Sequence, residues 1–207
     1  MPRLLKIDAS RAATSCFLNI PYDKNFERLF LAYIAGISAL GLTPRATLEI
    51  PGGTRRLDRI LQLIESCRYS IHDLSRVQPD RNPPPAPRFN MPFEAALAVA
   101  LERMNPRSKR VWFIFEAVPR RLEKSLSDLA GTDVYIHHGK IDGLHRQLNN
   151  AFERTGVSVQ QMKSIYRDLR RNLPMILQET VAINVYEASA FRRLVVLSKM
   201  SAKRQVV

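Results

Sequence analysis

The feature that most constrains the fold is a regular alternation of short apolar runs with helical patterns over the first two thirds of the chain. Five runs predict strands, at residues 15–20, 46–50, 69–74, 110–115 and 134–137. Apolar residues recur at helical spacing between them, in residues 26–37, 57–64, 90–104 and 120–130. Alternating strands and helices usually form a parallel sheet covered on both faces. The pattern predicts an α/β fold: a three-layer parallel sheet of about five strands.

The alternation stops at about residue 140. Helical patterns follow at residues 144–152, 159–177 and 181–200, the second interrupted by Pro174. We therefore divide the chain into an α/β domain, residues 1–139, and a C-terminal α-helical extension, residues 140–207. A length of 207 residues suits one such domain with an appendage.

The charge of the chain favours phosphate-bearing partners. Its net charge is +13 and its pI is about 10.3, which suits nucleotides, nucleic acid or an anionic surface. A generally basic, solvated surface is the alternative. Arginine pairs at 120–121, 170–171 and 192–193 lie along helices without interleaved aromatic residues. Nucleic acid is therefore the less favoured partner.

Other classes of protein are disfavoured by composition. The most apolar stretch, residues 29–42, is shorter than the roughly 20 residues that cross a bilayer. The N-terminus lacks the apolar segment of a secretory signal. Cys16 and Cys67 are expected to be reduced core thiols. We expect a cytoplasmic protein that makes no membrane contact and needs no cofactor. We expect no metal either, because no Cys/His cluster has the spacing of metal ligands.

The strongest candidate for chemistry is Glu94, which we expect in the first turn of the helix after a Pro-rich loop at 76–88. Open parallel sheets bind ligands beyond the carboxyl ends of their strands, where the third strand, this loop and this helix should meet. A carboxylate there could stabilise an oxocarbenium-like transition state at a glycosidic carbon, or attack it. Alternatively, Glu94 only offsets the helix dipole.

A second candidate is the Gly-rich loop at residues 51–56. Gly52 and Gly53 would expose backbone N–H groups before a helix, and Arg55 and Arg56 would add donors for a phosphate. The loop lacks the spacing and the Lys-Ser/Thr ending of a P-loop, and it is not the dinucleotide-binding fingerprint. The alternative is a tight turn followed by a solvated helix start.

Further ligand-binding candidates lie at strand ends near the expected crevice, or just before the helix of Glu94. They are Asn19, Tyr22, Asp73 and Phe89. Asp73 could bind ribose hydroxyls, and Tyr22 or Phe89 could stack on a base. Asp73 could instead cap the turn with Ser75.

Three segments resemble a known group of proteins. They are Phe-Leu-Asn-Ile-Pro-Tyr at 17–22, the helix–strand passage at 60–75, and Phe-Glu-Ala-Ala-Leu-Ala-Val-Ala-Leu at 93–101. Over residues 14–138 the chain resembles nucleoside 2-deoxyribosyltransferase-like proteins and, more distantly, TIR-type NAD-cleaving domains. The resemblance implies a flavodoxin-like sheet and a catalytic role for Glu94.

Two other positions bear on that resemblance. Residues 51–53 fall where the TIR group carries a mobile loop after its second strand. Arg68 stands just before the third predicted strand, where the deoxyribosyltransferases tend to carry an Asp. An Arg there suits a phosphorylated ligand better than a free nucleoside.

These observations favour a nucleotide N-glycosidase that cleaves NAD or a nucleoside phosphate through Glu94. A non-catalytic nucleotide-sensing module, whose helical extension transmits the signal, is the first alternative. A basic nucleic-acid-binding protein is the second.

The helical extension is expected to mediate self-association. Its last helical pattern places apolar residues on more than one face, so it needs a partner besides its own core. These residues are Val181, Ile183, Val185, Phe191, Leu194, Val195, Val196 and Leu197. In the alternative, the helices pack only on one another and on the sheet.

Overall fold

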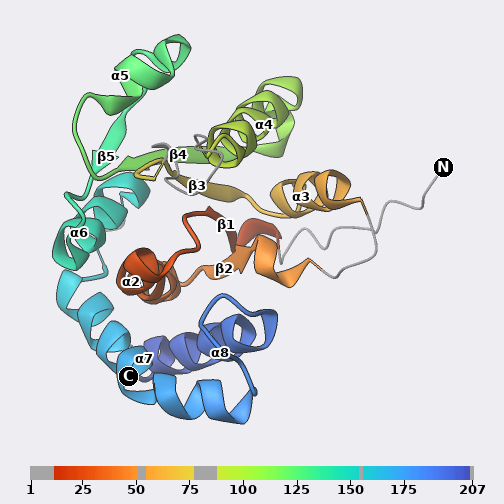
Figure 1. The fold of residues 1–207 in the computed structure, drawn as a ribbon. Coiled ribbons are helices and arrows are strands. Elements are labelled where there is room, and N and C mark those ends of the chain that lie inside the picture. The colour runs from red at the N-terminus through yellow and green to blue at the C-terminus, as the bar shows by residue number, and fades with distance from the viewer. Residues whose placement is uncertain (1–11, 51–54, 77–87, 154–155, 206–207) are drawn as a thin grey trace.

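Five parallel strands form one sheet in the computed structural model, which describes residues 12–50, 55–76, 88–153 and 156–205 (Figure 1). The strands are β1 (Ser15–Asn19), β2 (Thr43–Ala46), β3 (Tyr69–Asp73), β4 (Val111–Glu116) and β5 (Val134–Ile136). Their order in space, β2-β1-β3-β4-β5, is that of flavodoxin-like folds. The predicted α/β, flavodoxin-like parallel sheet with C-terminal helices is confirmed.

Helices cover both faces of the sheet, and two more lie outside them. The α-helices are α2 (Glu27–Ala39), α3 (Arg56–Glu65), α4 (Asn90–Met104), α5 (Arg121–Ser125), α6 (Ile141–Phe152), α7 (Val159–Glu179) and α8 (Ala188–Arg204). The 3-10 turns are η1 (Lys24–Phe26), η2 (Thr47–Glu49), η3 (Pro106–Ser108) and η4 (Ser127–Leu129). α3, α4 and α5 pack on one face, and α2 and α6 on the other. α7 and α8 lie against the outer side of α2.

Strand β1 is buried from end to end because helices cover both of its faces. Its side chains alternate between the two layers, as strand geometry requires. Cys16 and Leu18 belong to the core on the α2 side, and Phe17 belongs to the core shared with α3 and α4.

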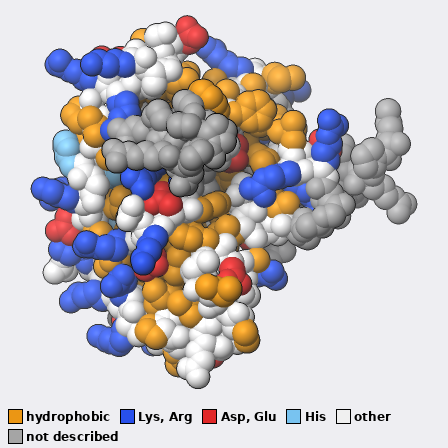
Figure 2. All heavy atoms as spheres, in the orientation of Figure 1, with side chains coloured by type: hydrophobic (Ala, Val, Ile, Leu, Met, Phe, Trp, Pro, Cys, Tyr) orange, Lys and Arg blue, Asp and Glu red, His pale blue; other side chains and the backbone are white. Residues whose placement is uncertain are grey.

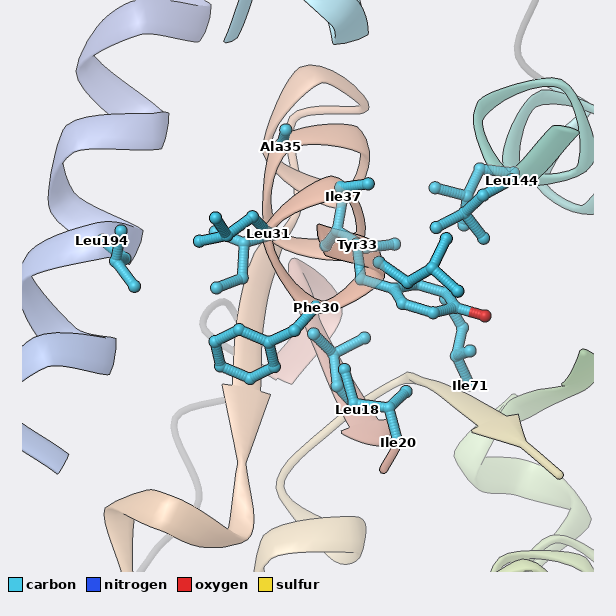
Figure 3. Packing of buried hydrophobic residues seen from close by; sticks show 14 of the residues in the cluster. Leu18, Ile20, Phe30, Leu31, Tyr33, Ala35, Ile37, Ile71, Leu144 and Leu194 are labelled. Carbon is cyan, nitrogen blue, oxygen red and sulfur yellow. The ribbon is translucent and has the colours of Figure 1, made fainter. Parts of the chain in front are cut away.

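Helix α2 is buried on every side, with no exposed residue from Leu29 to Ser38. In Figure 3, Leu31 points toward Leu194 of α8, whereas Tyr33 extends the other way toward Leu144 of α6. At Gly36 an added Cβ would come within 2.4 Å of the Leu148 side chain, so glycine allows α2 and α6 to approach closely.

The second strand was predicted in the wrong place. We expected it at 46–50, but the strand is Thr43–Ala46 and a 3-10 turn follows it. The Glu49 carboxylate accepts hydrogen bonds from the Ala46 N–H (3.1 Å) and Arg45 Nε (2.8 Å), which turns the chain away from the sheet. Pro44 is tolerated inside the strand because β2 lies at the sheet edge.

Three helical predictions also need correction. The helix expected at 120–130 is two short pieces, α5 and η4, and Pro174 lies inside an uninterrupted α7. The helix expected at 181–200 begins only at Ala188. Its first part is a connection in which the N–H groups of Val181 and Ala182 bond back to the last carbonyls of α7.

The apolar residues of the extension are divided between core and surface. Val185, Phe191 and Leu194 are fully buried, whereas Val181 and Ile183 are 88% and 90% exposed. Packing on α2 and α7 therefore accounts for the buried residues within one chain, and self-association stays a prediction. Among the described residues, none of the helices has the length and apolar character needed to cross a membrane.

Leu194→Ala should lower the free energy of unfolding by about 2–5 kcal/mol, because it opens a cavity between α8 and α2. Val196→Ala, on the same helix but half-exposed, is the control, expected within about 0.5 kcal/mol of wild type. Urea denaturation followed by circular dichroism measures both. We expect one transition, because α8 shares the core of the sheet domain. Separate unfolding of the extension, or equal effects of the two variants, would contradict this.

Candidate functional site

A pocket of about 400 Å³ opens at the carboxyl end of β1. β1 has β2 on one side and β3 on the other, so the chain order reverses here, which is where open α/β sheets bind ligands. The described residues that line the pocket are Asn19, Ile20, Pro21, Tyr22, Thr47, Arg56, Arg88, Asn90, Met91 and Glu94. Four of the residues predicted from the sequence, Asn19, Tyr22, Arg56 and Glu94, are thus brought together.

Glu94 is buried in this pocket, with only 6% of the residue exposed. Burial raises the pKa of its carboxyl to about 7, and the nearby Arg56 opposes that shift. The prediction that Glu94 lies in the first helical turn was wrong, because α4 begins at Asn90 and its first turn carries no acid. Since the helix dipole acts mainly within that turn, it does not explain why a carboxyl is here.

Asn19 fixes the start of α4 over the end of the sheet. Its Nδ2 donates to the Met91 carbonyl (2.8 Å) and lies 3.0 Å from His72 Nδ1. Burial lowers the pKa of His72 to about 3, so the ring is neutral and Nδ1 accepts this bond. The other ring nitrogen, Nε2, then donates to Ser70 Oγ at 3.0 Å. Asn19 therefore positions the helix of Glu94.

Tyr22 forms a fixed wall of the pocket. Its hydroxyl lies 3.1 Å from Thr47 Oγ1, and its ring packs against Phe30 and Tyr186 with centroids 6.2 and 5.6 Å away. Burial, aided by the charge of Glu94, raises the pKa of the phenol well above its usual value, so it stays protonated. These contacts hold the ring from several sides and fix its orientation.

Two arginines give the pocket its positive charge. Arg56 is the first residue of α3, and Arg88 comes just before α4. Sequence reasoning found Arg56 but missed Arg88, together with Thr47 and Asn90. Arg88 opens the Arg-Phe-Asn-Met-Pro stretch that leads into α4, and its place near a helix start was the available signal.

Asp73 is not among the described residues that line the pocket. Its fully buried carboxylate accepts hydrogen bonds from the Tyr33 hydroxyl (2.7 Å), the Ser75 N–H (2.9 Å) and His137 Nε2 (3.1 Å). The Gly139 N–H donates to His137 Nδ1, so the proton is on Nε2. Asp73 therefore caps the turn with Ser75, and its oxygens are already used within the protein.

The remaining predicted ligand residues do not join the pocket lining. Phe89 is 69% exposed, and Arg55 is exposed at the start of α3. Arg68 precedes β3, so it lies at the opposite, amino edge of the sheet, where it lines a separate hollow and covers the Tyr69 ring at 5.3 Å. Gly52 and Gly53 lie outside the described residues.

The described part of the chain has no group of three or more His, Cys, Asp or Glu residues that could hold a metal ion.

Figure 2 shows Lys and Arg side chains spread among hydrophobic and acidic groups over the face that Figure 1 presents to the viewer. On the face drawn, the positive side chains are thus distributed among groups of other kinds.

Comparison with known proteins adds no assignment: no family model, curated protein or solved structure matches the chain. The resemblance to deoxyribosyltransferase-like and TIR-type proteins therefore stays a prediction. The site has to be interpreted from its own chemistry, which is a buried carboxyl facing a pocket with two guanidinium groups.

Glu94→Gln should stabilise the protein, most strongly above pH 7. The pKa of Glu94 is about 7 in the folded state, against 4.5 for the unperturbed group. As pH rises from 4.5 to 7 the unfolded chain releases this proton first, so wild type loses stability relative to the amide variant. The difference should level off at roughly 3 kcal/mol above pH 7.

Urea denaturation of both proteins from about pH 4 to about pH 8 measures this difference. Glu102→Gln, on the same helix but outside the pocket lining, is the matched control. A Glu94→Gln effect that is independent of pH would contradict the raised pKa.

Proposed function

We propose that this protein is a nucleotide N-glycosidase that cleaves NAD or a nucleoside phosphate, with Glu94 as its catalytic carboxylate. The observation that carries the proposal is the buried Glu94 carboxyl in a pocket of about 400 Å³ that also holds Arg56 and Arg88. Guanidinium groups suit the phosphates of a nucleotide, and a desolvated carboxylate suits a developing positive charge.

The reaction needs one carboxylate and one water molecule. The bond between the sugar C1 and the base nitrogen breaks, and its electron pair leaves with the base. The ionised Glu94 carboxylate stabilises the oxocarbenium-like transition state, and water then adds to C1 and releases a proton. From NAD the products are nicotinamide, ADP-ribose and one proton. Arg56 and Arg88 would hold the phosphates and so place C1 beside Glu94.

NAD is the favoured substrate because its nicotinamide ring is a cation. Glu94 has a pKa of about 7 because burial disfavours its charged form. A cationic ring beside it would favour the carboxylate and lower that pKa. Bond cleavage neutralises the ring and moves the positive charge onto the sugar. The same carboxylate can therefore stabilise both charges in turn.

A nucleotide-sensing module without catalysis is the second candidate. It is favoured by the contact between the pocket and the C-terminal helices, in which Tyr186 packs on Tyr22 and its hydroxyl donates to the Asp23 carbonyl at 2.5 Å. Binding at the pocket could then reach the extension directly. Such a module would bind nucleotides and release no base.

Glu94→Gln should reduce the release of nicotinamide from NAD at least about 100-fold, because the amide cannot balance the positive charge of the transition state. Chromatography of the released base measures the rate, and calorimetry with ADP-ribose should show binding close to that of wild type. For wild type, kcat/KM should rise with pH and level off above about 7, because the reaction needs the ionised carboxylate.

Glu102→Gln, which makes the same change further along α4, should keep wild-type activity. Full activity in Glu94→Gln would refute the catalytic role. Nucleotide binding by wild type with no base release from NAD or nucleoside phosphates, with or without candidate activators, would favour the sensing module.

A further inference from the structure

One carboxylate, that of Asp23, holds two arginines beside the pocket. Arg76 makes a two-point contact with it, from Nη2 to Oδ1 at 3.0 Å and from Nε to Oδ2 at 3.2 Å. Arg88 Nη1 lies 3.5 Å from Oδ2. The Asp23 side chain is only 16% exposed, so these contacts are partly shielded from solvent. The geometry of Arg88 is therefore set partly by Asp23.

The position of Asp23 connects this cluster to the pocket. Asp23 directly follows the pocket-lining residues Ile20, Pro21 and Tyr22, and Arg88 itself lines the pocket. Two guanidinium groups and one carboxylate together carry one net positive charge. The carboxylate can thus orient Arg88 without cancelling the attraction of the cluster for an anion.

The C-terminal helices reach the same residue. Tyr186, on the connection between α7 and α8, donates from its hydroxyl to the Asp23 backbone carbonyl at 2.5 Å. Its ring packs against Tyr22 and Phe30, with centroids 5.6 and 5.0 Å away. Burial raises the pKa of the Tyr186 phenol well above its usual value, so it remains a donor at neutral pH.

The connection that carries Tyr186 is itself held by local hydrogen bonds. The Tyr186 N–H donates to Asn184 Oδ1 at 2.9 Å, and the Ile183 N–H donates to Glu187 Oε1 at 2.7 Å. The hydroxyl is therefore presented to Asp23 from a defined turn. A displacement of this turn would remove a hydrogen bond from the residue that orients Arg88.

We propose that Asp23 is a positioning residue that fixes Arg88 as a phosphate-binding group of the pocket, and that the C-terminal helices hold Asp23 in place through Tyr186. The proposal rests on the proposed function only in taking a phosphorylated nucleotide as the ligand. It makes the helical extension a determinant of ligand affinity. Base release depends on Glu94, whereas this cluster contributes to phosphate binding together with Arg56.

The test compares two probes that differ only in a phosphate, AMP and adenosine, by calorimetry. Asp23→Asn keeps the size of the side chain but removes its charge, and we expect it to weaken AMP binding about tenfold. Tyr186→Phe removes only the hydroxyl, and we expect a loss of about threefold. Adenosine affinity should stay unchanged in both variants, because the adenosine lacks the group that Arg88 binds. Asp23→Glu should restore part of the AMP affinity.

Matched controls are Tyr166→Phe and Asp168→Asn on α7, which lie outside this cluster and should leave AMP binding unchanged. In turnover with NAD, Asp23→Asn should raise KM by a similar factor with little change in kcat. A structural role alone would alter the affinity for both probes.

Equal losses for AMP and adenosine, or no loss for either, would overturn the proposal. So would a wild-type protein that binds AMP no better than adenosine. The two proposals fail separately: a selective loss of AMP affinity without any base release would support this cluster and reject the glycosidase. If Asp23→Asn does not fold, Tyr186→Phe alone decides, because it keeps the ring and its packing.

Discussion

The rest of the structure depends on the burial of α2 on all sides between Leu29 and Ser38. A helix that is apolar on all sides cannot lie at the surface of a three-layer fold, because half of it would face water. Between Leu29 and Ser38 every residue of α2 is buried. The sheet and α6 cover its inner sides, and α7 and α8 cover the outer one. The C-terminal helices are therefore required by the composition of a helix far earlier in the chain.

The same helix connects the core to the site. On the sheet side, the Tyr33 hydroxyl donates to Asp73, whose carboxylate also binds the Ser75 N–H after β3. On the outer side, Phe30 packs against Tyr186 and Phe191 of the extension. The chain that leads into α2 carries Tyr22 and Asp23. The burial of α2 thus positions a pocket wall and brings the extension against it.

Periodicity was enough to predict the parallel sheet, because it reports which side of an element is buried. Glu94 was selected instead from its expected place near a helix start beyond the carboxyl ends of the strands. It failed at β2, where Thr-Pro-Arg-Ala has no apolar run and the strand is defined by its pairing with β1. It also could not show that Tyr33 and His137 converge on Asp73, which decides between ligand binding and turn capping. Arg88 and Tyr186 contact Asp23 although they lie 65 and 163 residues further along the chain. A local sequence pattern cannot predict contacts between residues so far apart in the sequence.

Two carboxyl groups beside one pocket differ in their partners, and this difference separates their roles. Asp23 is bonded to Arg76 and Arg88 and caps η1 by accepting from the Asn25 N–H. The Glu94 side chain has no hydrogen bond to another described residue, and burial raises the pKa of its carboxyl to about 7. A carboxylate whose oxygens are occupied is suited to hold other groups in place. A carboxyl that is desolvated and lacks such partners gains most when a cation arrives, so Glu94 is placed where a cationic ligand would complete its interactions.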